Sequence, residues 1–177
     1  MLVALLSTLR IIHILAAAVW VGSVFFNYFL LRPALLRIPV PHAVVVAQRV
    51  GTIFLYTGWT ALGLLFASGA LRLYYADQIP LIFTLGFYAY GQGRSIAVMI
   101  LAWFITVVDV AIISFVLRPR LIQKLSVSSN PRHADVEKRR AAQIAASEWL
   151  ERLNLINVIT STLALIAGAS IMYGGLF

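Results

Sequence analysis

The amino-acid sequence predicts an all-α fold, an integral membrane antiparallel four-helix bundle formed by a single domain over residues 1–177. Hydrophobic residues make up 62% of the chain and charged residues only 11%, with a mean hydropathy of +0.93, which leaves too few charges to cover a soluble globule. Four long runs with few charges, each bounded by arginine, also exceed the roughly 20 residues that a helix needs to cross about 30 Å of hydrocarbon. The predicted spans are 9–32, 46–74, 94–118 and 150–176, so the lipid bilayer is the first expected partner.

The first run carries His13, the one histidine that lies inside an apolar run. Steps of three and four residues return to the same face of a helix, and they place one stripe of mostly polar residues here: Arg10, His13, Ala17, Trp20, Ser23 and Asn27. We expect this stripe to face partner helices rather than lipid, with Trp20 and Gly22 as packing residues. A signal peptide is the alternative interpretation, but the apolar run is longer than the roughly 15 residues of such a segment, which favours a retained helix.

We expect the first helix to end near Arg32 and Pro33, because proline interrupts the helical hydrogen-bond pattern. The second helix is expected to begin near His42 and to run to Tyr74, with small residues that suit close helix packing: Gly51, Gly58, Gly63 and Gly69. A loop rich in aromatic residues then leads to Arg94. Its apolar stretch, 81–87, is too short to span a membrane, and the sequence leaves open whether it lies in the interface or covers the bundle as a lid.

The third run contains Asp109, the one acidic residue inside a membrane run. A charge at the centre of a membrane costs at least about 2.5 kcal/mol, so Asp109 needs a hydrogen-bond partner or a proton. Counting from the flanking arginines places Asn157 of the fourth run at the same depth, roughly 13 Å from the helix end. We predict that Asn27, Asp109 and Asn157 are buried polar residues. Asp109 is then either a hydrogen-bonded contact between helices or part of a proton or ion relay.

The fourth run follows a charged segment, 131–149, whose pattern predicts a cytoplasmic amphipathic helix continuous with the span, with Trp149 at the interface. The chain contains no cysteine, which excludes disulfides, thiolate metal sites and a thiol nucleophile. It also lacks a glycine-rich phosphate loop, a Ser-His-Asp set and paired carboxylates placed for acid–base chemistry. The sequence therefore favours a protein that is not an enzyme, without deciding the point.

The formal net charge of +8 reflects membrane topology rather than nucleic-acid binding. Three basic residues, Arg10, Arg72 and Arg94, flank one side of the predicted spans. Eleven lie in the connections on the other side: Arg32, Arg37, Arg49, Arg118, Arg120, Lys124, Arg132, Lys138, Arg139, Arg140 and Arg152. Since cytoplasmic loops carry the excess of lysine and arginine, both basic connections are predicted to be cytoplasmic and both termini outside.

Several stretches of the sequence resemble successive pieces of one membrane protein family: LRIIHILAAAVWVGSVFF, QRVGTIFLYTGWTALGLLFASGALRL, ISFVLRPRL and RLNLINVITSTLALIAGA. They are similar to the bacterial copper-resistance D (CopD) family and, more distantly, to its protoporphyrinogen-oxidase relative HemJ. The most specific part is the spacing of His13, Trp20 and Gly22. The resemblance implies a bacterial inner-membrane protein of copper uptake or export, or a heme-binding protein. Many CopD proteins have about twice as many helices, which implies other membrane subunits or a second copy as partners.

Counting residues along the helices gives a candidate metal site that does not depend on the resemblance. His13, Met99 and Met172 all fall within roughly 5–10 Å of the predicted outer boundary. One imidazole and two thioethers form a soft ligand set suited to Cu(I). Two alternatives stay open: His13 as an axial ligand of heme b, and His13 as a structural residue bonded to a neighbouring helix. His42 and His133 are predicted at the cytoplasmic side, so two histidines cannot ligate one heme inside the bundle.

Three function classes follow from the sequence. The first is copper transport or handling of the CopD type. The second is a structural or accessory subunit of a larger membrane complex, which would use its exposed aromatic and small residues for docking. The third is a b-type heme protein.

Overall fold

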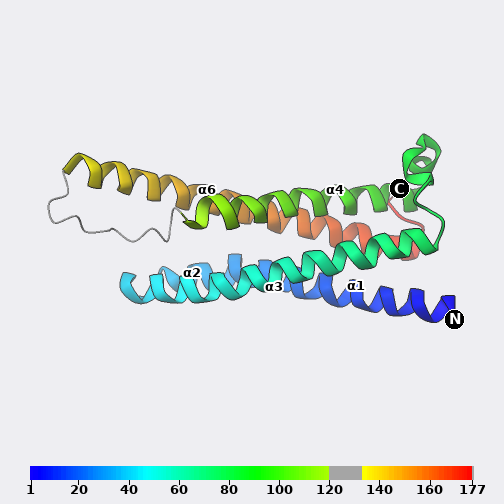
Figure 1. Cartoon of the computed structure of the whole chain (residues 1–177), viewed down its shortest axis with the longest axis horizontal. Helices are drawn as coiled ribbons and strands as arrows, with labels where there is room; N and C mark the ends of the chain where they lie inside the picture. The colour runs from blue at the N-terminus through cyan, green and yellow to red at the C-terminus, as the bar shows by residue number, and fades with distance from the viewer. Residues whose placement is uncertain (120–132, 177) are drawn as a thin grey trace.

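The computed structural model describes residues 1–119 and 133–176, and Figure 1 shows their helices packed side by side. The first long helix consists of α1 (Leu2–Phe25), a π-helical segment η1 (Phe26–Leu31) and α2 (Arg32–Leu35). The second is α3 (Val40–Tyr75), the third is α4 (Gly91–Ile112) with its π-helical extension η4 (Ile113–Leu117), and the fourth is α6 (His133–Ser170). The described residues contain no strand, and the predicted all-α four-helix bundle is confirmed.

Within the described residues, four helices are long and apolar enough to cross a membrane: Leu2–Leu35, Val45–Tyr75, Gly91–Leu117 and Ile144–Tyr173. Large apolar side chains are exposed on every one of them, for example Leu15, Ile53, Leu101 and Ile159. An outward apolar face of this extent is stable against lipid tails and unfavourable in water. The chain is a multi-pass membrane protein.

Contacts between the helices show that every neighbouring pair is antiparallel. At each interface, residue numbers rise on one helix as they fall on the other. Helices α1 and α3 meet at His13 with Ser68 and at Trp20 with Gly58, and α3 meets α4 and its extension η4 at Trp59 with Ser114 and at Leu62 with Trp103. Helices α4 and α6 meet at Ser95 with Ser170 and at Thr106 with Thr160, and the first helix meets α6 at Trp20 with Ser161 and at Arg32 with Glu151. The helices therefore follow one another around a square in the order α1, α3, α4, α6. Both chain ends lie at the same end of the bundle (Figure 1).

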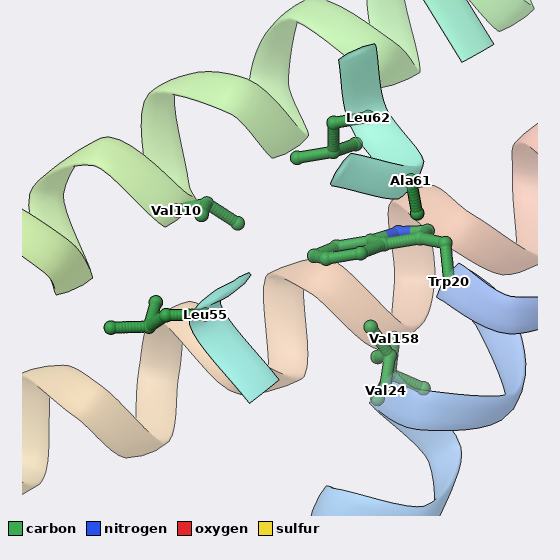
Figure 2. Packing of buried hydrophobic residues seen from close by; sticks show 7 residues of the cluster. All are labelled: Trp20, Val24, Leu55, Ala61, Leu62, Val110 and Val158. Carbon is green, nitrogen blue, oxygen red and sulfur yellow. The ribbon is translucent and has the colours of Figure 1, made fainter. Parts of the chain in front are cut away.

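The core lies at mid-bundle, where side chains from all four helices meet (Figure 2): Trp20, Val24, Leu55, Ala61, Leu62, Val110 and Val158. The largest of them is Trp20, which is only 3% exposed. A second, smaller cluster of Leu117, Ala146 and Leu153 lies between η4 and α6.

Three tryptophans bond the α1–α3 pair to the α4–α6 pair. Trp20 donates its indole N–H to the Ser161 hydroxyl at 3.0 Å, and Trp59 donates to the Ser114 hydroxyl at 3.2 Å. Trp103 donates to the backbone carbonyl of Leu62 at 3.1 Å. Because lipid tails are as apolar as leucine, packing and hydrogen bonds of this kind, rather than the hydrophobic effect, hold membrane helices together.

The first helix was predicted to end near Arg32 and Pro33; it passes through the proline and ends at Leu35. The π-helical segment η1 precedes the proline, and the N–H of Arg32 bonds back to the carbonyl of Asn27, five residues earlier. Pro33 then occupies the first turn of α2, where its missing N–H leaves no hydrogen bond unmade. A shift of hydrogen-bond register thus accommodates a proline that the sequence pattern alone marks as a helix end.

The stripe predicted on the first helix is turned slightly from its expected direction. Its buried positions are Leu9, Ala16, Trp20 and Val24. His13, Ala17, Ser23 and Asn27 lie at the edges of this face and are partly exposed, while Arg10 is exposed. The polar residues therefore flank a mainly apolar seam rather than form its centre.

The other helices extend beyond the predicted membrane spans. Helix α3 begins at Val40, before the span that starts at 46, and α6 begins at His133, well before the span that starts at 150. Of the predicted cytoplasmic segment 131–149, the residues from 133 belong to α6 and 131–132 lie outside the described residues.

The aromatic loop between α3 and α4 is folded onto the end of the bundle that holds the termini. It forms two short 3₁₀ helices, η2 (Leu81–Phe83) and η3 (Leu85–Ala89). The Arg94 guanidinium donates to the carbonyls of Ala89 at 3.1 Å and Leu176 at 2.9 Å. One side chain thus joins the loop, the start of α4 and the C-terminal segment.

Candidate functional site

His13 lies between α1 and α3, and its hydrogen bonds define which ring nitrogen carries the proton. Its Nδ1 is 2.8 Å from the Ser68 hydroxyl oxygen. That hydroxyl donates its own hydrogen to the carbonyl of Leu64, four residues back, at 2.5 Å. Since a serine hydroxyl has one hydrogen, Ser68 accepts at this contact and His13 donates. His13 is therefore the Nδ1–H tautomer, and the lone pair of Nε2 is left available.

The ring of His13 is also fixed by its packing. Its Cε1 atom lies against Gly69, where an added Cβ would come within 3.3 Å. Ser68 and Gly69 together hold the imidazole at a close approach to the α3 backbone. In the described residues, Nε2 makes no hydrogen bond to protein, so it is the atom of this side chain that can bind a ligand.

The predicted thioether ligands occupy other interfaces of the same part of the bundle. Met99 packs on α6, where its sulfur would lie 3.4 Å from a Cβ added to Gly168. The register of Trp103 with Leu62 and of His13 with Ser68 places Met99 in about the same layer as His13, on the diagonally opposite helix. Met172 lies beyond α6 in η5 (Ile171–Tyr173) and is 72% exposed. His13 contacts Ser68 and Gly69 on α3, whereas Met99 contacts Gly168 on α6, so the two side chains face different interfaces.

Beneath His13, Trp20 fills the bundle. Its ring edge lies against Gly58, where an added Cβ would come within 2.9 Å, and its centroid is 5.9 Å from that of Phe54. Figure 2 shows the indole lying among side chains of the other three helices. By contrast Gly22 is exposed, and a Cβ added there would meet nothing within 4 Å. Trp20 thus separates the His13 end of the bundle from the opposite half.

The predicted buried polar residues fall into two groups. Asp109 on α4 and Asn157 on α6 are 5% and 2% exposed, whereas Asn27 is partly exposed in η1. The Asp109 Oδ2 and Asn157 Oδ1 atoms are buried and have no hydrogen-bond partner in the described residues. Thr106 and Thr160, one turn away on the same two helices, are bonded to each other at 3.2 Å.

His13 and His42 lie too far apart along the bundle to ligate the same heme. His42 lies near the start of α3, 26 residues before Ser68, the partner of His13, which corresponds to about 39 Å along a helix. In the part of the chain that the structure describes, no three His, Asp or Glu side chains are grouped to hold a metal. An open hollow of about 270 Å³ between α4 and α6 is lined only by Ile112, Val116, Leu117, Trp149 and Leu153.

Ser68 was not among the predicted site residues, although the sequence contains the signal for it. If the first two helices form a hairpin that turns near Val40, residues equally distant from that turn face each other. Counting 27 residues back reaches His13, and counting 28 forward reaches Ser68. The same counting could not have revealed that the Ser68 hydroxyl faces the imidazole, because that depends on the rotation of each helix.

Comparisons with protein-family models, curated proteins and solved structures find no match for this chain. The resemblance to the CopD family therefore stays a prediction from the residues quoted for it.

Proposed function

We propose that this chain is a copper-handling membrane protein of the CopD type that takes Cu(I) as its cargo through Nε2 of His13. The observation that carries the proposal is the hydrogen bond from His13 Nδ1 to Ser68. Metal-binding histidines almost always donate their other ring N–H to a neighbouring acceptor, which fixes the tautomer and the direction of the ligating nitrogen. A histidine with a purely structural role makes such a bond too. The two roles are therefore distinguished by whether Nε2 binds a metal.

The surrounding donors favour Cu(I) over harder ions. Imidazole suits copper, zinc, iron and nickel, and thioether sulfur selects Cu(I). Met99 lies in the layer of His13, and exposed Met172 lies at the adjacent end of the bundle, where an incoming ion would first meet the protein. The chain has no cysteine to provide the thiolates of an alternative soft site. Trp20 and the core around it close the bundle on the inner side of His13.

The first test is Cu(I) binding by the purified protein under reducing conditions, with His13→Ala and Ser68→Ala beside the wild type. We expect Ser68→Ala to weaken Cu(I) binding by roughly 10–100-fold, because removal of a partner that orients a metal ligand typically has this effect. Loss of the ligand itself in His13→Ala should reduce binding further. Ser68→Thr keeps a hydroxyl group and should restore most of the affinity.

The matched control is Ser114→Ala. Like Ser68, Ser114 donates to the carbonyl four residues earlier and accepts a ring N–H from a neighbouring helix, here that of Trp59. Its loss should disturb packing to a similar degree without changing copper binding. Equal, negligible copper in wild type and His13→Ala would refute the proposal. If Ser68→Ala and Ser114→Ala weakened Cu(I) binding equally, Ser68 would have no specific role in orienting His13.

We also propose that the protein lies in a bacterial inner membrane with both termini outside. Eleven basic residues in the two connections opposite the termini, against three at the other side, support this orientation. Arg32 pairs with Glu151 at 2.5 Å and Arg118 donates to Thr52, both at the end away from the termini. Arg32 also lies over Tyr28 and Arg152 over Trp149, the combination of cationic and aromatic side chains typical of a membrane interface.

A pair of reporters fused after Phe177 tests the orientation. A reporter that is active only in the periplasm should be active, and one that is active only in the cytoplasm should be silent. The same reporters inserted after Pro131, between the last two spans, should give the reverse pattern. A cytoplasmic signal from the fusion at Phe177 would invert the proposed topology.

A further inference from the structure

Two oxygen atoms buried between α4 and α6 lack hydrogen-bond donors. Asp109 Oδ2 and Asn157 Oδ1 belong to side chains that are 5% and 2% exposed, and neither atom has a partner in the described residues. Buried polar atoms are nearly always hydrogen-bonded, and an exception calls for a specific explanation. Both atoms are acceptors if the carboxyl group is ionised, so neither can satisfy the other in that state.

The register of the two helices places these side chains opposite each other. Thr106 on α4 bonds Thr160 on α6. Asp109 follows Thr106 by three residues and Asn157 precedes Thr160 by three, and the helices are antiparallel, so both steps lead one turn in the same direction. The carboxyl and the carboxamide thus occupy one level of the same interface.

The two threonine hydroxyl groups at this interface cannot supply the missing donor. Thr160 donates to the carbonyl of Ile156 at 2.9 Å, which uses its only hydrogen. At the contact between the two threonines, Thr106 must therefore be the donor, which uses its hydrogen as well. The single hydrogen of each threonine hydroxyl is therefore already used and cannot be donated to Asp109 or Asn157.

We propose that Asp109 is a proton-binding site at the centre of the bundle, in which the protonated carboxyl donates its O–H to the side-chain carbonyl oxygen of Asn157. One proton satisfies both orphaned atoms, because it converts the Asp109 oxygen from an acceptor into a donor. A metal ion fits less well, since Ca²⁺ takes about six to eight oxygen ligands and Mg²⁺ also needs a full octahedral set. This site is independent of copper binding at His13, which lies on the α1–α3 interface.

Among the described residues, no charged side chain is buried at the level of Asp109. The buried side chains of the core at this level are uncharged: Trp20 and Val24 on α1, Leu55, Ala61 and Leu62 on α3, and Val158, Thr160 and Ser161 on α6. Tyr28, Arg118 and Arg152 lie at least a helical turn farther along their helices, and Tyr56 is 75% exposed toward lipid. Without a cation nearby, the neutral carboxyl is the favoured form of a side chain buried in a membrane.

Protonation then links the ion state of Asp109 to the contact between α4 and α6. While the proton is bound, the carboxyl and the carboxamide attract each other across the interface. When the proton leaves, a carboxylate faces a carbonyl oxygen, and this contact becomes repulsive unless the amide rotates or the helices separate. Asp109 therefore gives the bundle a proton-dependent contact at its centre.

Infrared spectroscopy of the full chain in lipid vesicles at neutral pH tests the proposal, because a protonated carboxyl has a carbonyl stretching band separate from that of carboxylates. We expect this band in the wild type and its loss in Asp109→Asn, in which an amide N–H can still donate to Asn157 and preserve the fold. Asn157→Ala should keep the band but shift it, since the O–H loses its acceptor. Glu148→Gln, which changes an exposed carboxyl, should leave the band unaltered.

Several results would overturn the proposal. A wild-type spectrum without the band would mean that Asp109 is ionised, as it would be if the Asn157 amide were turned over and donated its N–H to a carboxylate. Persistence of the band in Asp109→Asn would assign it to another carboxyl. An unshifted band in Asn157→Ala would show that Asn157 does not accept the hydrogen bond from Asp109. A band that appears only when sodium is replaced by choline would show that the site holds a metal cation instead of a proton.

Discussion

Trp20→Ala should lower the free energy of unfolding by about 3–5 kcal/mol, the range observed when a buried Trp or Phe is reduced to Ala. The indole is 3% exposed and contacts helices on two sides, with its ring against Gly58 and its N–H bonded to Ser161. Its removal leaves a void at the level where all four helices meet (Figure 2) and breaks one of the three tryptophan bonds between the helix pairs. Trp20→Phe retains most of the ring and should cost less, since it loses mainly the hydrogen bond, which contributes about 1 kcal/mol.

Equilibrium unfolding in mixed micelles with increasing SDS measures this effect. Trp149→Ala is the matched control, because Trp149 is 55% exposed and its loss should change the unfolding free energy by less than about 1 kcal/mol. If Trp20→Ala and Trp149→Ala proved equally stable, the indole of Trp20 would not be the packing centre of the bundle. A Trp20→Phe variant as unstable as Trp20→Ala would assign the effect to the bond with Ser161 rather than to the ring.

The class of fold could be predicted from the sequence because a membrane restricts the possible structures so strongly. A run of apolar residues such as 94–118 has to be a spanning helix when no water is available for its backbone groups. Local rules were less successful where the tertiary structure allowed an exception. Pro33 would end an ordinary α-helix, but the change to π-helical hydrogen bonding before it lets the helix continue to Leu35. The spacing of His13 and Trp20 indicated a face that contacts other helices, yet it did not reveal that Arg10 lies exposed beside this face.

The candidate site could be predicted only in part, for a related reason. Residue counting gives the depth of a side chain in the membrane, and depth placed His13 with Met99 and Asp109 with Asn157. It does not give the interface that each side chain faces. His13 faces Ser68 on α3 and Met99 faces Gly168 on α6, and these directions follow from the order of helices around the bundle. The hydroxyl groups of Ser68 and Thr160 both donate to backbone carbonyls, and these bonds determine the chemistry of His13 and Asp109. Such bonds can be identified only from atomic positions.

Gly93→Ala should detach the aromatic loop from the end of the bundle and destabilise the protein by about 1–3 kcal/mol, the usual range for overpacking. Gly93 is buried in the first turn of α4. A Cβ at this position would overlap the backbone carbonyl oxygen of Phe87 and lie 2.7 Å from its carbonyl carbon. Backbone atoms cannot move aside as a flexible side chain can, so the loop itself must shift. Its displacement would also withdraw the Ala89 carbonyl from the guanidinium of Arg94.

Gly86→Ala provides the control within the same loop, since a Cβ added to Gly86 meets nothing within 4 Å. Limited proteolysis should cut residues 76–90 faster in Gly93→Ala than in Gly86→Ala or the wild type, and SDS unfolding should show the matching loss of stability. Because Arg94 also binds the carbonyl of Leu176, a detached loop should leave the C-terminal segment less firmly held. Identical cleavage rates in the two glycine variants would mean that the loop does not pack against α4 at Gly93.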